Sequence, residues 1–64
     1  MKLYIGARVY WRDPDPDQDC SGVGMIMHMQ HDPPFADSVI DLDMDAGGEV
    51  EALPHELEPL EDRE

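Results

Sequence analysis

The sequence predicts an all-β fold, a small five-stranded barrel with one 3-10 turn before the last strand. Apolar residues occur in short runs without helical periodicity. Clusters of Pro, Gly and Asp separate these runs at spacings typical of consecutive strands. The 64 residues form one domain at most, so we assign residues 1–60 to the barrel and residues 61–64 to a frayed acidic C-terminal tail.

The first two expected strands are a short strand and a longer, bent one. Residues 8–11, RVYW, follow Gly6 and end before Pro14, because proline lacks the N–H that a ladder requires. The second strand covers residues 22–30, GVGMIMHMQ, with apolar residues on both faces and a bend at Gly24. One side of this strand should hold a row of apolar residues, partly core and partly an adaptable exposed surface: Val23, Met25, Met27 and Met29.

The remaining strands are bounded by clear turn signals. Residues 38–44 alternate as a third strand, and residues 45–48 form a hairpin turn whose glycines supply positive φ. Residues 49–53 form a fourth strand, Pro54 opens a single helical turn, and residues 58–60 add a short fifth strand. The residues expected to point inward are Ile40, Leu42, Met44, Val50 and Ala52.

Three larger side chains are expected to close the small core. Trp11 is core or a groove wall, and burial obliges its indole N–H to find an acceptor. Phe35 lies in a proline-rich loop and is expected to fold back onto the barrel. Leu57 or Leu60 is expected to plug the barrel end.

Short motifs spread along the chain carry a resemblance to known barrels. They are GARV at residues 6–9, GMI at 24–26, an acidic strand, GG at 47–48 and LPHEL at 53–57. This series resembles the core of SH3-like barrels of the Tudor and KOW type. The resemblance implies the meander of five strands, in which the sheet curls toward closure and limits its exposed edges.

A second set of motifs is similar to a narrower group of proteins. It consists of VYW at residues 9–11, DPD at 13–15, CSG at 20–22 and PHEL at 54–57. The group comprises short, uncharacterised bacterial proteins often found on phages, plasmids and other mobile genetic elements. The similarity covers about residues 5–60, and it implies a fold and a genomic habitat but no activity.

Two functions found in such barrels require particular residues, which can be compared with those of this chain. The resemblance to type II dihydrofolate reductase would require a Val-Gln-Ile-Tyr pore segment, but residues 50–53 read VEAL. A glutamate in that pore would repel the negatively charged folate and NADPH, so this activity is rejected. A Tudor-like reader of methylated Lys or Arg needs an aromatic cage, for which Tyr10, Trp11 and Phe35 are candidates if they approach one another.

The net charge of −12, from 16 acidic and 4 basic residues, excludes several partners. It opposes association with DNA, RNA or anionic lipid, so no direct nucleic-acid or membrane binding is expected. The first residues lack a signal peptide, Cys20 cannot form an internal disulfide, and no apolar run approaches the ~20 residues that span a bilayer. We therefore expect a cytoplasmic protein whose charge is either a solubilising shell or a surface for a basic partner.

The run DPDPDQD at residues 13–19 is the clearest candidate for a metal site, but it fails the test. An EF-hand loop needs glycine sixth and glutamate twelfth, where this chain has Gln18 and Gly24. Carboxylates beside Cys20 also disfavour a nucleophilic thiolate. We therefore expect no metal, no cofactor and no enzymatic activity; the possible zinc ligands form only a loose set: Cys20, His28, His31 and His55.

The sequence therefore favours a small acidic interaction module that binds a protein partner or another copy of itself. The alternative is an acidic nucleic-acid mimic, encoded on a mobile element, that inhibits a host DNA- or RNA-binding protein. An enzyme would require a subunit interface to build a pocket that one chain lacks. The candidate partner-binding surface consists of Tyr10, Trp11, Asp15, Asp17, Asp19 and Phe35.

Overall fold

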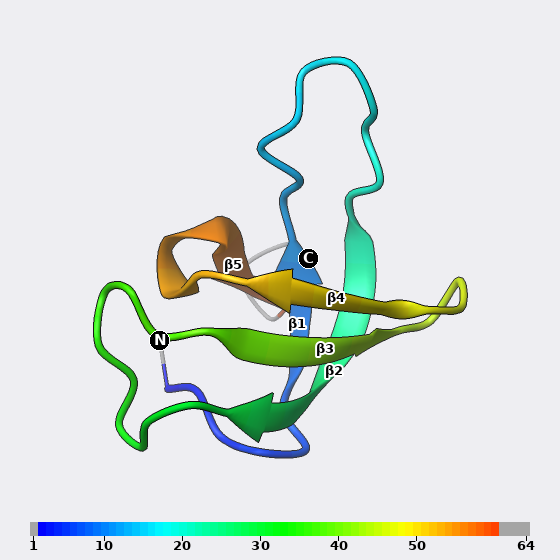
Figure 1. Ribbon diagram of the computed structural model, residues 1–64. Coiled ribbons are helices and arrows are strands. Elements are labelled where there is room, and N and C mark those ends of the chain that lie inside the picture. Colours follow the sequence, from blue (N-terminus) through cyan, green and yellow to red (C-terminus); the bar gives the residue numbers. More distant parts are fainter. Residues whose placement is uncertain (1, 61–64) are drawn as a thin grey trace.

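The chain folds into one antiparallel sheet, and the computed structural model describes residues 2–60. The predicted all-β class and the 3-10 turn before the last strand are confirmed, while the predicted tail at residues 61–64 lies outside the described residues. Residues 2–60 contain no helix with the length and apolar character needed to cross a membrane. The elements in Figure 1 are β1 (Arg8–Trp11), β2 (Gly22–Met29), β3 (Ile40–Met44), β4 (Glu49–Ala52), η1 (Pro54–Glu56) and β5 (Leu57–Pro59).

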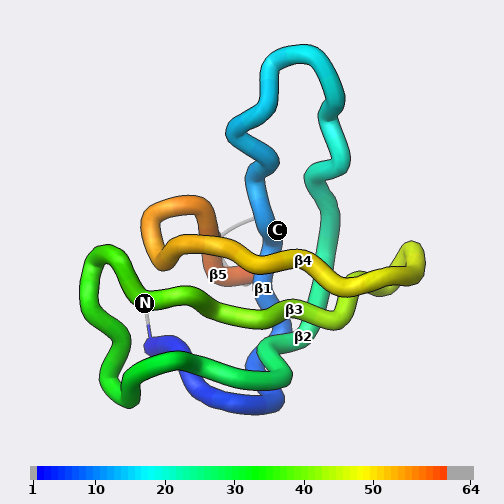
Figure 2. Tube along the Cα trace, viewed as in Figure 1, coloured from blue at the N-terminus to red at the C-terminus, as the bar shows by residue number. Residues whose placement is uncertain are grey.

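The sheet has the strand order β4-β3-β2-β1-β5, so the last strand returns beside the first. Residues 22–25 of β2 pair with β1, whereas residues 24–29 pair with β3. Figure 2 shows how β2 curves along its length to reach both neighbours. The predicted barrel is not confirmed, because within residues 2–60 no ladder joins β4 to β5 and the sheet is not closed.

The third strand begins two residues later than the sequence predicts, at Ile40. The two residues before it, Ser38 and Val39, are held by hydrogen bonds that involve side chains of the preceding loop, and not by a strand ladder. The hydroxyl of Ser38 is fully buried, accepts the N–H of Phe35 at 2.7 Å and lies 2.9 Å from His31 Nδ1. Because these bonds fix residue 38 to its own loop, regular pairing starts only after it.

A β-bulge in β2 corrects the prediction for the methionine row. The register of β2 against β3 shifts between Ile26 and His28, so Met27 has no opposite residue and is 49% exposed. One extra residue moves every later side chain to the other face. The prediction that Met29 shares a side with Met25 and Met27 is therefore wrong: Met29 turns inward and is buried.

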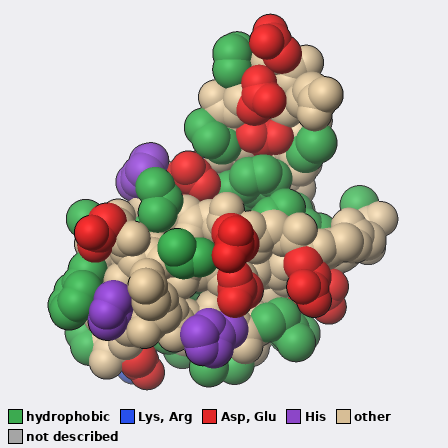
Figure 3. All heavy atoms as spheres, in the orientation of Figure 1, with side chains coloured by type: hydrophobic (Ala, Val, Ile, Leu, Met, Phe, Trp, Pro, Cys, Tyr) green, Lys and Arg blue, Asp and Glu red, His purple; other side chains and the backbone are tan. Residues whose placement is uncertain are grey.

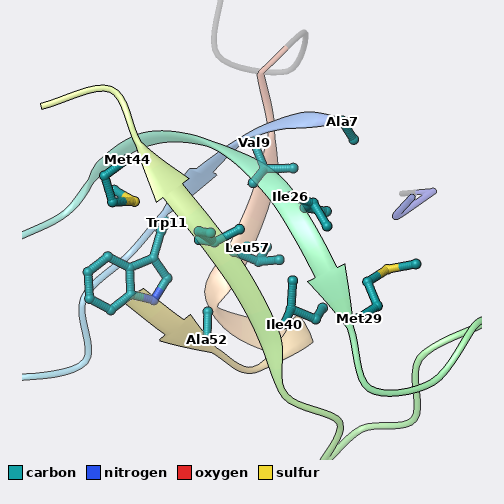
Figure 4. Close-up of a cluster of buried hydrophobic side chains, with 10 residues drawn as sticks. Ala7, Val9, Trp11, Ile26, Met29, Ile40, Met44, Ala52 and Leu57 are labelled. Atoms are coloured by element: carbon teal, nitrogen blue, oxygen red, sulfur yellow. The ribbon is translucent and has the colours of Figure 1, made fainter. Parts of the chain in front are cut away.

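The core occupies the inner face of the curved sheet. The predicted inward residues of β3 are buried, Ala52 is buried, and Val50 packs partly buried against the cluster. Leu57, rather than the partly buried Leu60, supplies the last core residue. Figure 4 shows these side chains converging from all five strands. The buried cluster consists of Ala7, Val9, Trp11, Ile26, Met29, Ile40, Leu42, Met44, Ala52 and Leu57.

Two predicted glycine roles have clear physical causes. A Cβ at Gly24 would lie 2.9 Å from Met44 Sδ and 3.0 Å from the Asp43 backbone oxygen, so only glycine lets β2 and β3 approach this closely. Gly47 and Gly48 have φ values of 107° and 85°, which confirms the predicted hairpin turn.

The indole of Trp11 is buried and finds the acceptor that the sequence requires. Trp11 Nε1 donates to Glu56 Oε1 at 3.0 Å. The same oxygen accepts the backbone N–H of Leu53 at 3.2 Å. One carboxylate of η1 therefore ties β1 to the segment that leads into β5.

Candidate functional site

The predicted site residues lie in separate parts of the molecule. Trp11 points into the core, whereas Tyr10, its neighbour on β1, is partly exposed and has the Arg12 guanidinium 6.0 Å from its ring centroid. Phe35 does not fold back onto the sheet: it is 59% exposed and its ring centroid lies 4.4 Å from that of His31. Its loop and the long loop after β1 lie at opposite ends of the view in Figure 1. The structure therefore does not bring Phe35 to Tyr10 and Trp11, and these rings form no cage.

The long loop, residues 12–21, uses its alternating carboxylates to bind its own backbone. Asp13 Oδ1 accepts the N–H of Asp15 at 2.9 Å, and Asp13 Oδ2 accepts the N–H of Cys20 at 3.0 Å. Asp15 Oδ1 accepts the N–H of Asp17 at 2.9 Å. The residue between each pair is proline, which has no N–H to satisfy and restricts φ. These successive Asx turns, which the spacing of Asp and Pro could have indicated, build the loop.

The return arm of the long loop is closed in the same way. Asp19 Oδ1 accepts the N–H of Ser21 at 3.0 Å, and Ser21 Oγ accepts the N–H of Asp13 at 2.8 Å. Hydrogen bonds from the side chain and the backbone of Ser21 lower the pKa of Asp19 below its ordinary value. Within residues 2–60 no group of three or more His, Cys, Asp or Glu residues is arranged to hold a metal ion. The carboxylates of this loop are therefore structural acceptors as well as charges.

A second set of acids lies on the outer side of β3 and β4, and we call it the acidic face. Asp41 is directly opposite Glu51, and Asp43 is directly opposite Glu49. Asp41 is partly exposed and the other three are exposed. Figure 3 shows acidic side chains both on the projecting loop and over the front of the body. The alternation of acids at residues 41–45 predicts the solvent-exposed side of a strand, but which acids lie opposite one another depends on the β3–β4 register.

Cations do little to neutralise the acidic face. Arg8 is paired with Asp45 in the hairpin turn. Arg12 Nη2 lies 2.7 Å from Glu58 Oε2 on the far side of the sheet order. His28 Nδ1, 3.5 Å from Asp41 Oδ2, is the one basic group paired with a member of the acidic face among the described residues. The acidic face is therefore a region of concentrated negative potential.

An apolar groove lies beside this face, between the start of β2 and the β3–β4 hairpin. It has a volume of about 560 Å³ and is lined by residues 20–23 and 44–50. Val23, Met44 and Val50 give it apolar walls, and Asp45 and Glu49 give it an acidic border. This groove could not be predicted from the sequence, because two segments that are distant along the chain form it.

Comparison with known proteins gives no match: neither a family model, nor a curated protein, nor a solved structure is similar to this chain. The resemblance to SH3-like barrels and the mobile-element habitat therefore stay predictions. The function is inferred from three features of the molecule, namely the long loop, the acidic face and the apolar groove.

Proposed function

We propose that this protein is a small acidic interaction module that binds a basic segment of a partner protein. The observation that carries the proposal is the acidic face, where Asp41 and Asp43 stand opposite Glu51 and Glu49. Like charges directly opposite each other in a sheet destabilise it, by an amount on the order of 0.2–1 kcal/mol per pair. The two pairs lower the stability of the fold and concentrate negative charge on its surface. This concentration of charge favours a role in recognition.

The strand arrangement supports an SH3-like assignment for this module. Consecutive strands β1 to β4 are neighbours, β5 returns beside β1, and η1 immediately precedes β5. We propose that this arrangement is a partly open version of the SH3-like barrel. In that assignment the long loop and the β3–β4 hairpin flank one end of the sheet, where they border the apolar groove.

The reactive side chains favour binding over catalysis. Cys20 is exposed on the long loop. Each histidine has a partner elsewhere: His28 lies near Asp41, His31 contacts Ser38 Oγ at 2.9 Å, and His55 lies 4.0 Å from a Glu56 oxygen. A thiol nucleophile needs a base within hydrogen-bond reach, and these three histidines are engaged at other sites.

The proposal is tested by comparing two variants that lose the same charge at different places. Asp43→Asn/Glu51→Gln removes two charges from the acidic face, and Asp32→Asn/Asp37→Asn removes two from the exposed loop before β3. The probe is a lysine-rich, acetylated and amidated peptide, titrated by calorimetry at low salt and again at higher salt.

Two results are expected from this titration. The face variant should bind the peptide at least about tenfold more weakly than the unmodified protein, whereas the loop variant should differ by less than about threefold. Binding to the unmodified protein should weaken as salt rises, because exposed charges are screened beyond ~10 Å at 0.1 M. Equal weakening in both variants, or no binding by the unmodified protein, overturns the proposal.

A second candidate is an acidic mimic that occupies the nucleic-acid site of a DNA- or RNA-binding protein. It is favoured by the long loop, which projects from the sheet in Figure 1 and holds Asp13, Asp15 and Asp19 in fixed positions through hydrogen bonds to its backbone. Negative charges held in fixed positions are what a phosphate backbone presents. Failure to displace duplex DNA from nucleases or repressors of the host at low salt would end this candidate.

A further inference from the structure

The two edges of the sheet differ in whether they can accept another strand. The edge strand β5 has three residues, Leu57–Pro59. Arg12 N–H donates to the Glu56 carbonyl at 2.9 Å, and antiparallel alternation then turns the backbone groups of Glu58 toward β1 and those of Leu57 and Pro59 outward. Leu57 N–H already donates to the Pro54 carbonyl, and proline has no N–H. The β5 edge therefore has no donor for a new strand.

The β4 edge is the opposite case. Met44 N–H donates to the Gly48 carbonyl at 2.9 Å, so alternation directs the backbone groups of Val50 and Ala52 toward β3. The N–H and C=O groups of Glu49 and Glu51 consequently point away from β3, and within residues 2–60 no strand pairs with this edge. It offers two donors and two acceptors in strand spacing.

The side chains along the β4 edge specify which residues a sixth strand would need. A residue placed opposite Glu49 or Glu51 has its side chain on the same side as the acidic face. A residue placed opposite Val50 has its side chain on the inner side, where Val50 and Met44 line the apolar groove. The complementary strand therefore alternates cationic and apolar residues.

The same charges argue against a second copy of this chain as the occupant. Two β4 strands paired edge to edge would place Glu49 and Glu51 of one copy against the glutamates of the other. Like charges directly opposite destabilise a strand pair. A basic strand instead gains an opposite-charge pair at each of these positions, so charge complementarity selects a partner over self-association.

We propose that the β4 edge binds a partner by strand addition, and that the partner segment is extended and alternates Lys or Arg with apolar residues. This inference rests on the proposed function and specifies its partner and its binding mode. Backbone hydrogen bonds to Glu49 and Glu51 supply affinity, while their carboxylates and the groove beside Val50 supply specificity.

The test uses three synthetic peptides of alternating lysine and valine, acetylated and amidated. One is unmodified, one carries N-methyl groups on its lysine amides, and one carries the same number on its valine amides. In an antiparallel addition the lysines lie opposite Glu49 and Glu51 and turn their N–H groups toward β4. Lysine N-methylation should therefore weaken binding at least about tenfold, whereas valine N-methylation should change it less than about threefold.

A protein variant tests the same edge from the other side. Glu51→Pro removes an outward N–H without removing a bond to β3, and Glu51→Gln removes the same charge but keeps the N–H. The proline variant should bind the unmodified peptide at least about tenfold more weakly than the glutamine variant. Amide NMR spectra check that β3 and β4 stay paired in the variant. If the two strands do not stay paired, strand addition is judged from the methylated peptides alone.

The outcomes separate this inference from the proposed function. If the acidic-face variant weakens peptide binding but both methylated peptides bind alike, the module binds basic segments and strand addition is overturned. If the protein forms dimers by light scattering at micromolar concentration and Glu51→Pro abolishes them, the edge is used but the assigned occupant is wrong. A loss confined to valine N-methylation overturns the antiparallel register.

Discussion

The long loop and the acidic face both place acids at every second residue, yet the two regions use them in opposite ways. In the loop, Asp13 and Asp15 accept backbone N–H groups two residues ahead. On the face, Asp41 and Asp43 stand opposite further acids across the β3–β4 ladder. The intervening residues decide the outcome: proline removes N–H groups and favours turns, whereas Leu42 is buried and holds the chain in a strand. Alternating acids therefore stabilise the long loop through hydrogen bonds and destabilise the acidic face through repulsion.

The largest expected effect comes from removing the loop's most connected acceptor. Asp13→Ala leaves the N–H groups of Asp15 and Cys20 without their acceptors and should lower the free energy of unfolding by about 1–2 kcal/mol. Asp13→Asn keeps only one acceptor oxygen, so its free energy of unfolding should lie between those of Asp13→Ala and the unmodified protein. Urea unfolding measures both variants. Asp17→Ala, which loses the same charge, is the matched control and should cost less; equal losses would break the comparison.

A smaller effect of the opposite sign is expected on the acidic face. Glu51→Lys replaces a repulsive pair with Asp41 by an attractive one and should raise the free energy of unfolding by about 0.5–1 kcal/mol at low salt. The gain should shrink in 1 M salt, because exposed charges are then screened. Asp37→Lys makes the same charge change on an exposed loop and measures the general effect of net charge. A destabilised Glu51→Lys would contradict the interpretation of the face.

The smallest effect concerns the pH dependence of the loop. Hydrogen bonds from Ser21 lower the pKa of Asp19 from its ordinary value of 3.8 in the folded state. A lowered folded pKa means that this contribution to stability is present above about pH 3.8 and is lost as the pH falls through the folded pKa. Carbon-detected NMR titration of the Asp19 carboxyl should show the lowered pKa, and Ser21→Ala, which keeps the backbone N–H, should move it part of the way back toward 3.8; no movement would remove the Ser21 hydroxyl as a cause.

Elements that depend on local residues could be predicted from the sequence. Residues 8–11 form β1 between Gly6 and Pro14, Gly47 and Gly48 make the hairpin turn, and Pro54 opens η1 as predicted. Each follows from the φ preference or the missing donor of one residue. The all-β class and the order of elements follow from these signals taken together.

Features that depend on pairing between distant segments could not be predicted. The bulge at Met27 exists only relative to β3, and it decides which methionine is buried. Closure of the sheet depends on whether β4 and β5 come close enough to pair, which no local signal specifies. Within the candidate site, the acids of the long loop were identified from the sequence, but their bonds to the backbone were not. The prediction that Phe35 packs on the sheet was wrong, because Phe35 contacts His31 and Ser38 within its own loop.

The carboxylate of Glu56 that accepts the Trp11 indole N–H has a consequence for the order of folding. These residues are separated by 45 positions, and the β1–β5 ladder joins the same distant parts of the chain. Contacts of such long sequence separation form late, because loop closure must precede them. We therefore expect β1 to pair first with β2 and to gain its second neighbour when the last strand arrives. The sole tryptophan of the chain thus sits where its emission should report this long-range contact as it forms.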